Sequence, residues 1–88
     1  MLHKEFTIVN KLGLHARASA LFVKTASRFT ADIKLEKEGI EVNGKSIMGI
    51  MMLAASKGST VRLSVNGDDE ALALQTMGDL IVNGFGEE

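Results

Sequence analysis

His15 is the residue best placed for covalent chemistry, because it directly precedes a predicted helix in the segment Gly13-Leu14-His15-Ala16-Arg17-Ala18. The first-turn N–H groups of a helix are unpaired, and the helix dipole is positive at that end. This environment is expected to keep the imidazole neutral near pH 7, with a ring nitrogen free to attack phosphorus. A phosphoryl group on the ring would meet the backbone N–H groups of Ala16 and Arg17, and the Arg17 guanidinium suits phosphate oxygens. On spacing alone, a surface histidine that happens to lie at a helix start is the alternative.

Ser46 is the second candidate, because it directly precedes a short apolar segment, residues 47–55. Serine is a favoured helix N-cap, so capping alone would explain its presence. The large apolar residues that follow could be core. Since the segment is apolar nearly all round, part of it is expected to be exposed, where methionine suits a surface that binds several partners. A mixed role is therefore expected of Ile47, Met48, Met51 and Met52.

Three other features are expected to carry no chemistry. Residues 39–46 match the phosphate-binding loop pattern letter for letter, but residues 40–42 alternate like a strand and no long apolar strand ending in Asp accompanies them, so nucleotide hydrolysis is disfavoured. His3 lies on the first predicted strand without a partner at metal-ligand spacing; it is expected to be a solvated edge residue, and no metal site is predicted. The acidic end, Glu87-Glu88, is expected to be solvated.

The elements that must position His15 and Ser46 follow the order β-α-β-β-α-β-α. Alternating patterns predict strands over residues 2–9, 31–37, 40–42 and 60–65. Helical periodicity begins at Ala16, resumes over residues 47–55, and returns after Asp68 and Asp69, which are expected to cap the last helix. The predicted core stripes of the first and last helices are Ala18, Leu21, Phe22, Thr25, Ala26 and Phe29, and Ala73, Leu74, Met77, Leu80 and Ile81. This order predicts an α+β open-faced sandwich, with a four-stranded antiparallel sheet and three helices on one face.

Size and composition limit the function further. The 88 residues predict a single domain, 1–88, too small for a deep cleft, so chemistry must occur on a surface that a partner closes. A net charge of −1 and the absence of Tyr and Trp disfavour nucleic-acid binding, and the absence of Cys excludes disulfides. No signal-peptide pattern begins the sequence, and no apolar run approaches the ~20 residues of a membrane span, which predicts a cytoplasmic protein that does not bind membranes.

Two separated motifs resemble one known family. The segment Gly13-Leu14-His15-Ala16-Arg17 before an Ala/Ser-rich helix, together with Lys45-Ser46-Ile47-Met48-Gly49-Ile50-Met51, is similar to the histidine-containing phosphocarrier (HPr) family of the phosphoenolpyruvate-dependent phosphotransferase system. The resemblance covers nearly the whole chain in length and element order. It implies a carrier rather than an enzyme, which receives a phosphoryl group from an upstream phosphotransferase (enzyme I) and passes it to enzyme IIA-type acceptors. No cofactor is implied.

The resemblance also assigns roles to individual residues. His15 matches the histidine that the family phosphorylates at Nδ1, and Arg17 matches the arginine beside it. Ser46 matches the serine that a dedicated kinase, HPr kinase/phosphorylase, modifies in some bacteria. A phosphate there is expected to leave the fold intact and weaken docking, because it adds a charge of about −2 beside an apolar patch. The implied docking residues are Ala20, Lys24, Ser27, Ile47, Met48 and Met51.

The sequence departs from the family pattern at two places. Ala18 stands where many members have Pro, and residues 51–55 differ from many sugar-branch members. Both differences resemble the nitrogen-related branch and some proteobacterial members, so sugar transport and nitrogen or carbon regulation both stay open. A regulatory binding module that docks through residues 47–52, with phosphorylation of His15 only switching its affinity, is the alternative function. A carrier that visits several partners is expected to be a monomer.

Overall fold

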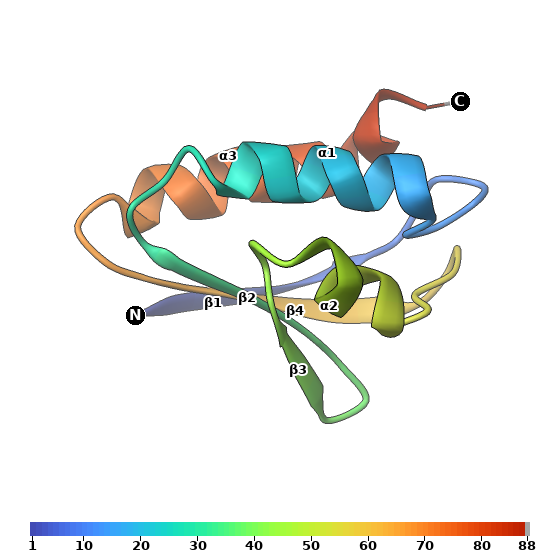
Figure 1. Ribbon diagram of the computed structural model, residues 1–88, viewed down its shortest axis with the longest axis horizontal. Coiled ribbons are helices and arrows are strands. Elements are labelled where there is room, and N and C mark those ends of the chain that lie inside the picture. The colour runs from blue at the N-terminus through green and yellow to red at the C-terminus, as the bar shows by residue number, and fades with distance from the viewer. Residues whose placement is uncertain (88) are drawn as a thin grey trace.

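Four strands form one antiparallel sheet in the computed structural model, which describes residues 1–87 (Figure 1). The strands are β1 (Leu2–Thr7), β2 (Asp32–Lys37), β3 (Ile40–Asn43) and β4 (Thr60–Asn66), in the spatial order β1-β4-β2-β3. Helices α1 (Ala16–Ala26), α2 (Ile47–Met52) and α3 (Glu70–Val82) cover one face, and a 3-10 turn, η1 (Gly84–Gly86), follows α3. The predicted α+β fold, with its antiparallel sheet and three helices, is confirmed.

The core lies between the sheet and the helices, as the alternating strand patterns require. In the central pair of strands, Leu35 of β2 faces Leu63 of β4 and Ile33 faces Val65, and all four side chains are buried. The largest fully buried side chains are Phe22, Ile8, Ile33, Leu35, Ile50, Leu63, Met77, Ile81, Val61, Val65 and Ser19. Of the predicted helical stripes, Leu21, Leu74 and Leu80 are only half-buried, and the others are buried.

Several predicted elements end at different residues. β1 stops at Thr7 rather than residue 9, and α2 stops at Met52 rather than near residue 55. Because α1 ends at Ala26, Phe29 of its predicted stripe lies beyond the helix. The early end of α2 has a local cause, because Ala54 adopts a positive φ of 49°. The Lys37 ammonium then donates hydrogen bonds to the carbonyls of residues 53 and 54, at 3.3 Å each, which satisfies carbonyl groups at this helix end.

The predicted cap of α3 is confirmed in position at Asp69, but the side-chain capping bond that it implies is not formed. Asp68 is an exposed residue before it. The Asp69 carboxylate instead accepts hydrogen bonds from the backbone N–H groups of Thr30, at 2.9 Å, and Ala31, at 2.8 Å. These bonds, that from Thr30 foremost, hold the pKa of Asp69 below its ordinary value. Asp69 therefore ties the start of α3 to the α1–β2 connection.

Over residues 1–87, no helix combines the length and the apolar character that a membrane-crossing helix needs.

Candidate functional site

The loop between β1 and α1 fixes the position of His15. Its residue Gly13 has a φ of +64°, and a Cβ atom there would lie 2.3 Å from the carbonyl oxygen of Ala55. Only glycine permits this approach without a shift of the backbone. The next residue, Leu14, is buried and donates a backbone hydrogen bond of 2.8 Å to the same carbonyl. His15 therefore enters α1 from a segment that is anchored to the neighbouring loop.

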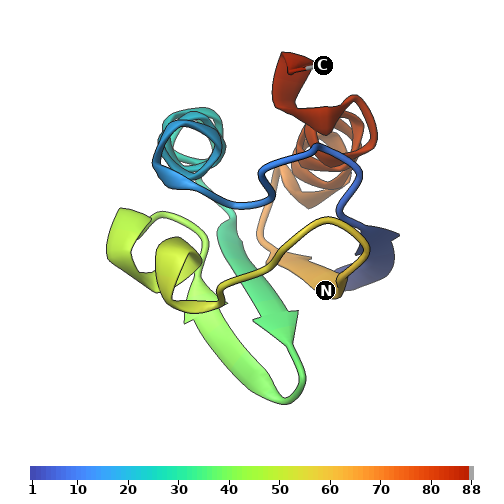
Figure 2. The ribbon, with the colours of Figure 1, turned by 90° about the vertical axis from the view of Figure 1, so that its right-hand side faces the viewer.

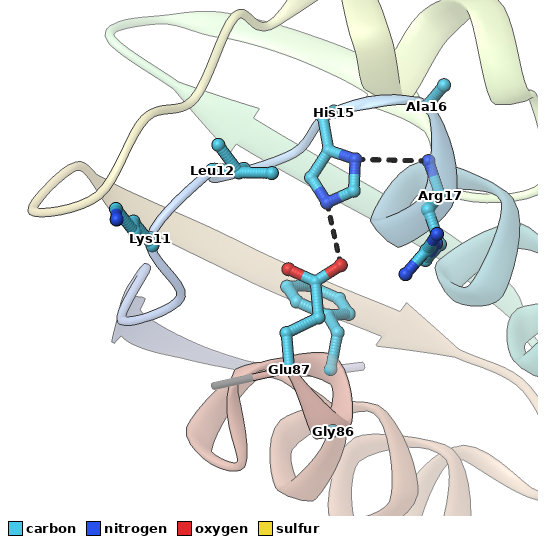
Figure 3. Close-up of a pocket in the computed structure, with 8 residues that line it drawn as sticks. Lys11, Leu12, His15, Ala16, Arg17, Gly86 and Glu87 are labelled. Carbon is cyan, nitrogen blue, oxygen red and sulfur yellow. Dashed lines mark hydrogen bonds and ion pairs between the residues drawn. The ribbon is translucent and has the colours of Figure 1, made fainter.

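His15 is the N-cap residue of α1, as its sequence position predicts, with an extended backbone (φ −75°, ψ −177°). Its Nδ1 atom accepts a hydrogen bond from the backbone N–H of Arg17 at 3.3 Å (Figure 3). Because a backbone N–H can only donate, Nδ1 presents a lone pair, and the proton of a neutral ring lies on Nε2. The bond is longer than the usual ~2.9 Å, so it is weak and costs little to break.

The second ring nitrogen of His15 contacts Glu87. Nε2 lies 2.7 Å from Oε2 of Glu87, whose side chain is 17% exposed. Oε1 of the same carboxylate accepts a hydrogen bond of 3.0 Å from the Asn10 amide, which also donates to the Gly13 carbonyl at 2.8 Å. The prediction of a solvated acidic end is therefore wrong for Glu87, and Glu88 lies outside the described residues.

The η1 turn brings Glu87 to His15. Phe85 is buried and adopts a positive φ of 59° within this turn, and the turn packs against α1. Sequence reasoning missed both Glu87 and Asn10. A polar residue at the start of a Gly-containing loop is a weak signal for Asn10, and nothing local marks Glu87.

The surroundings of the Glu87 carboxylate favour its charged form. The hydrogen bond from Asn10, with further contributions from His15 and Arg17, holds the pKa of Glu87 below its ordinary value, although partial burial acts in the opposite direction. The anionic carboxylate favours a proton on Nε2.

A shallow pocket of about 770 Å³ surrounds the His15 ring and opens to solvent. It is lined by Lys11, Leu12, His15, Ala16, Arg17, Phe85, Gly86 and Glu87. The structure thus places the three residues predicted for the phosphoryl site, His15, Ala16 and Arg17, around one cavity. An open pocket of this kind can admit the reactive group of a partner protein.

Two other features singled out in the sequence, His3 and residues 39–46, have structural positions that fit the sequence analysis. His3 is exposed on the edge strand β1, as predicted. Within residues 1–87, no three His, Cys, Asp or Glu side chains are grouped so that they could hold a metal ion. Residues 40–43 form β3, so the segment 39–46 does not adopt a phosphate-binding loop.

Ser46 caps α2, which confirms its predicted structural role. Its hydroxyl accepts a hydrogen bond of 3.2 Å from the backbone N–H of Gly49. The adjacent Lys45 ammonium donates to the Phe29 carbonyl at 2.7 Å, just after the end of α1. The start of α2 is therefore tied to the end of α1, and the two helices lie side by side (Figure 2).

The six predicted docking residues are all exposed. Ala20, Lys24 and Ser27 belong to α1 and its C-cap, and the others belong to α2. Met48 is 72% exposed, Met51 43% and Ile47 40%, whereas Ile50 alone carries the core contact of α2. The mixed role predicted for Ile47, Met48, Met51 and Met52 is wrong in its buried part, because Ile50 supplies the inward contact and all four of these side chains are exposed. They form an exposed apolar patch, called here the α2 patch.

Comparison with known proteins identifies the family. The sequence profile described as "PTS HPr component phosphorylation site" matches residues 2–83. The chain belongs to the HPr family. The phosphocarrier protein HPr of Xylella fastidiosa (strain Temecula1) is 50% identical over 88 residues, which cover 100% of this chain and 99% of the relative. A crystal structure of HPr from Thermoanaerobacter tengcongensis has a TM-score of 0.96 and 53% identity, covering 100% of this chain and 99% of that chain.

A second structure from Thermoanaerobacter tengcongensis, described as an HPr dimer, has a TM-score of 0.79 and 53% identity, with 99% of this chain and 100% of that chain covered. Like other HPr proteins, the present chain is a phosphocarrier of the phosphotransferase system. It accepts a phosphoryl group on a histidine from enzyme I and passes it to IIA proteins. It forms a phosphohistidine and is not an enzyme in the usual sense.

Proposed function

We propose that the phosphoryl group is carried on Nδ1 of His15. The supporting observation is that the two ring nitrogens have different partners. Nε2 contacts the Glu87 carboxylate, whereas Nδ1 has only the weak 3.3 Å contact with the Arg17 N–H. In the proposed transfer, the Nδ1 lone pair attacks phosphorus, and the Arg17 N–H turns from Nδ1 to a phosphoryl oxygen. The Ala16 N–H and the Arg17 guanidinium hold the other oxygens.

The magnitudes suit a carrier. The helix dipole contributes about 0.3–1 kcal/mol, and each hydrogen bond to a charged oxygen about 1.5–3 kcal/mol. These contributions stabilise the bound phosphoryl group but are small enough that its transfer to an acceptor is not blocked. Transfer in line between two histidine sites then depends mainly on positioning, which the partner completes by closing over the open pocket.

We propose that enzyme I and the IIA-type acceptors share one docking surface, formed by Ala20, Lys24, Ser27, Ile47, Met48 and Met51. Its support is the exposed α2 patch beside α1, because exposed methionine packs adaptably against different partners. The shared surface also requires that donor and acceptor bind one after the other.

Ser46 is the proposed regulatory phosphorylation site, for a kinase of the HPr kinase/phosphorylase type. Support comes from its position at the first turn of α2, next to Ile47 and Met48. The helix start tolerates a phosphate, whereas its charge of about −2 opposes docking of an apolar partner surface.

The physiological setting is also a proposal. The relatives described above are named HPr rather than as nitrogen-related proteins, which favours sugar uptake or carbon regulation over the nitrogen-related branch. We expect residues 1–88 to act as a single phosphocarrier domain in the cytoplasm, as is typical of the family. A monomer is expected, and light scattering after size-exclusion chromatography would detect the dimer described for the bacterial relative.

The decisive experiment is intact mass spectrometry after incubation with phosphoenolpyruvate, magnesium and enzyme I. Wild type, His15→Ala and the matched control His3→Ala are compared, because His3 is the other histidine and is exposed on β1. An acid-labile gain of one phosphoryl group in wild type and His3→Ala, but not in His15→Ala, is expected. A gain that survives in His15→Ala would refute the assignment.

The regulatory binding module is the second candidate, and the exposed α2 patch is the observation that favours it. The two functions differ in what His15→Ala does. A carrier without its histidine transfers nothing, whereas a binding module would still bind its regulatory partner in one fixed state. Measured partner binding together with absent transfer would show that both functions operate.

A further inference from the structure

We infer that Glu87 keeps Nε2 of His15 protonated throughout the transfer cycle, so that the phosphorylated ring is a cation whose N–P bond is primed to break. The inference rests on the proposed attachment of the phosphoryl group to Nδ1. It makes Glu87 a positioning residue that also sets how readily the phosphoryl group leaves. Neither the dipole of α1 nor the residues next to His15 in the sequence supply a negative charge at Nε2.

The geometry of the contact supports a lasting ion pair in the phosphorylated protein. The Nε2–Oε2 distance is 2.7 Å, at the short end for an N–H···O bond and typical of a charge-assisted one. Asn10 holds the other carboxylate oxygen at 3.0 Å, so the Glu87 side chain is fixed before the reaction begins. With His15 only 27% and Glu87 17% exposed, water screens the contact less than it would a surface pair.

Of the charged residues around the ring, one can balance a positive charge on the imidazole. Among the described residues that line the pocket, Glu87 is the acid, and Lys11 and Arg17 are the bases. Arg17 comes from α1 and Lys11 from the preceding loop, and both suit the phosphoryl oxygens rather than a ring that carries positive charge. The carboxylate therefore neutralises the ring while the bases neutralise the phosphoryl group.

The electron balance shows why the proton matters. As the donor's N–P bond breaks, its electron pair stays on the donor ring, while the Nδ1 lone pair forms the new N–P bond. His15 gives up no proton, so its ring now carries phosphorus on Nδ1, a proton on Nε2 and one positive charge. When the acceptor, or water, attacks phosphorus, the N–P electron pair returns to Nδ1 and the ring leaves neutral. A ring without the Nε2 proton would have to leave as an anion, which is a much poorer leaving group.

The size of the effect follows from the charge pair. An opposite charge within about 4–6 Å shifts a proton equilibrium by roughly one to three powers of ten. Because this contact is only partly buried, we take the lower end, about tenfold. Loss of the Glu87 charge should therefore lower the protonated fraction of the phosphorylated ring by up to about tenfold at mildly alkaline pH.

The test compares wild type with Glu87→Gln, which keeps the side-chain shape and an acceptor oxygen but removes the charge. Glu70→Gln is the matched control, because Glu70 also has a lowered pKa, caused mainly by a hydrogen bond from the Gly67 N–H, but lies at the start of α3 outside the pocket. Each protein is phosphorylated with phosphoenolpyruvate and enzyme I, enzyme I is removed, and the decay of the phosphorylated form at about pH 8 is followed by intact mass. Nitrogen-15 NMR of the imidazole reports protonation of Nε2 directly.

We expect Glu87→Gln to prolong the half-life of the phosphorylated form by up to about tenfold, to slow transfer to a IIA protein similarly, and to show a deprotonated Nε2 signal. Glu70→Gln should match wild type. An unchanged half-life and Nε2 signal in Glu87→Gln would overturn the inference, even if uptake became slower, because slower uptake alone indicates a structural role. Failure of wild type to take up a phosphoryl group on His15 would instead refute the proposed function on which the inference rests.

Discussion

Replacing Gly13 by Ala tests whether close backbone packing positions His15. A Cβ atom at Gly13 would lie 2.3 Å from the carbonyl oxygen of Ala55 and 2.8 Å from Cα of Ser56. Both are backbone atoms, which cannot rotate away as a side chain can. Gly39 provides a matched control, since its φ of +82° is also left-handed but a Cβ atom there meets nothing within 4 Å.

The expected magnitudes differ between the two variants. An alanine in the left-handed region costs about 1–2 kcal/mol, which applies to both positions. Forcing atoms into a packed region adds about 1–3 kcal/mol, which applies to Gly13 alone. Gly13→Ala should therefore lose about 2–5 kcal/mol of unfolding free energy and Gly39→Ala about 1–2 kcal/mol. Small domains have about 5–15 kcal/mol of stability, so the expected losses of both variants lie at or below the lower end of that range.

Urea unfolding followed by circular dichroism measures the stability of the two variants. The rate of phosphorylation by enzyme I measures the site, because the backbone shift also breaks the 2.8 Å hydrogen bond between Leu14 and Ala55 that anchors the entry to α1. A displacement of ~1 Å can cost about 100-fold in rate. Gly39→Ala should keep the wild-type rate, because its turn joins β2 to β3, away from α1 (Figure 1). Equal losses of stability in the two variants, or an unchanged rate in Gly13→Ala, would refute the reasoning.

Four further predictions follow from the structure. Met48→Lys should weaken binding to enzyme I by about 5–30-fold, or about 1–2 kcal/mol, in calorimetric titration; Leu72→Lys, at an exposed apolar site on α3, should leave the affinity unchanged. Ser46→Asp should slow phosphotransfer while thermal unfolding stays close to wild type, and equal transfer rates would contradict the proposed regulation. Ala54→Gly should raise the unfolding free energy by about 0.5–1 kcal/mol, because Ala54 has a φ of 49°. Hydrogen bonds, that from the Thr30 N–H foremost, lower the pKa of Asp69, so its contribution to stability is complete above the unfolded value of about 3.9 and is lost as the pH falls through the lowered pKa. Urea unfolding of Asp69→Asn should accordingly depend less on pH between about pH 5 and pH 2 than that of wild type, and an identical dependence would contradict this assignment.

The sequence determined the elements and one half of the site. Strand and helix periodicities are local, so the positions of the four strands and the inward stripe of α1 could be predicted from spacing alone, whereas the pairing of β2 with β4 could not. The N-cap positions of His15 and Ser46 were predictable for the same reason, because capping depends on neighbouring residues in the chain. The two motifs at these helix starts were enough to indicate the family.

Only the tertiary structure decided the other half of the site. Glu87 lies 72 positions from His15 in the chain, and Asp69 lies 39 positions from Thr30, yet both pairs are joined by hydrogen bonds. No periodic pattern specifies which surface carboxylate meets which partner. That choice depends on how the η1 turn, with Phe85 buried at a positive φ, packs against α1. The contact that holds Nε2 of His15 was therefore not readable from the sequence, because a residue 72 positions away in the chain supplies it.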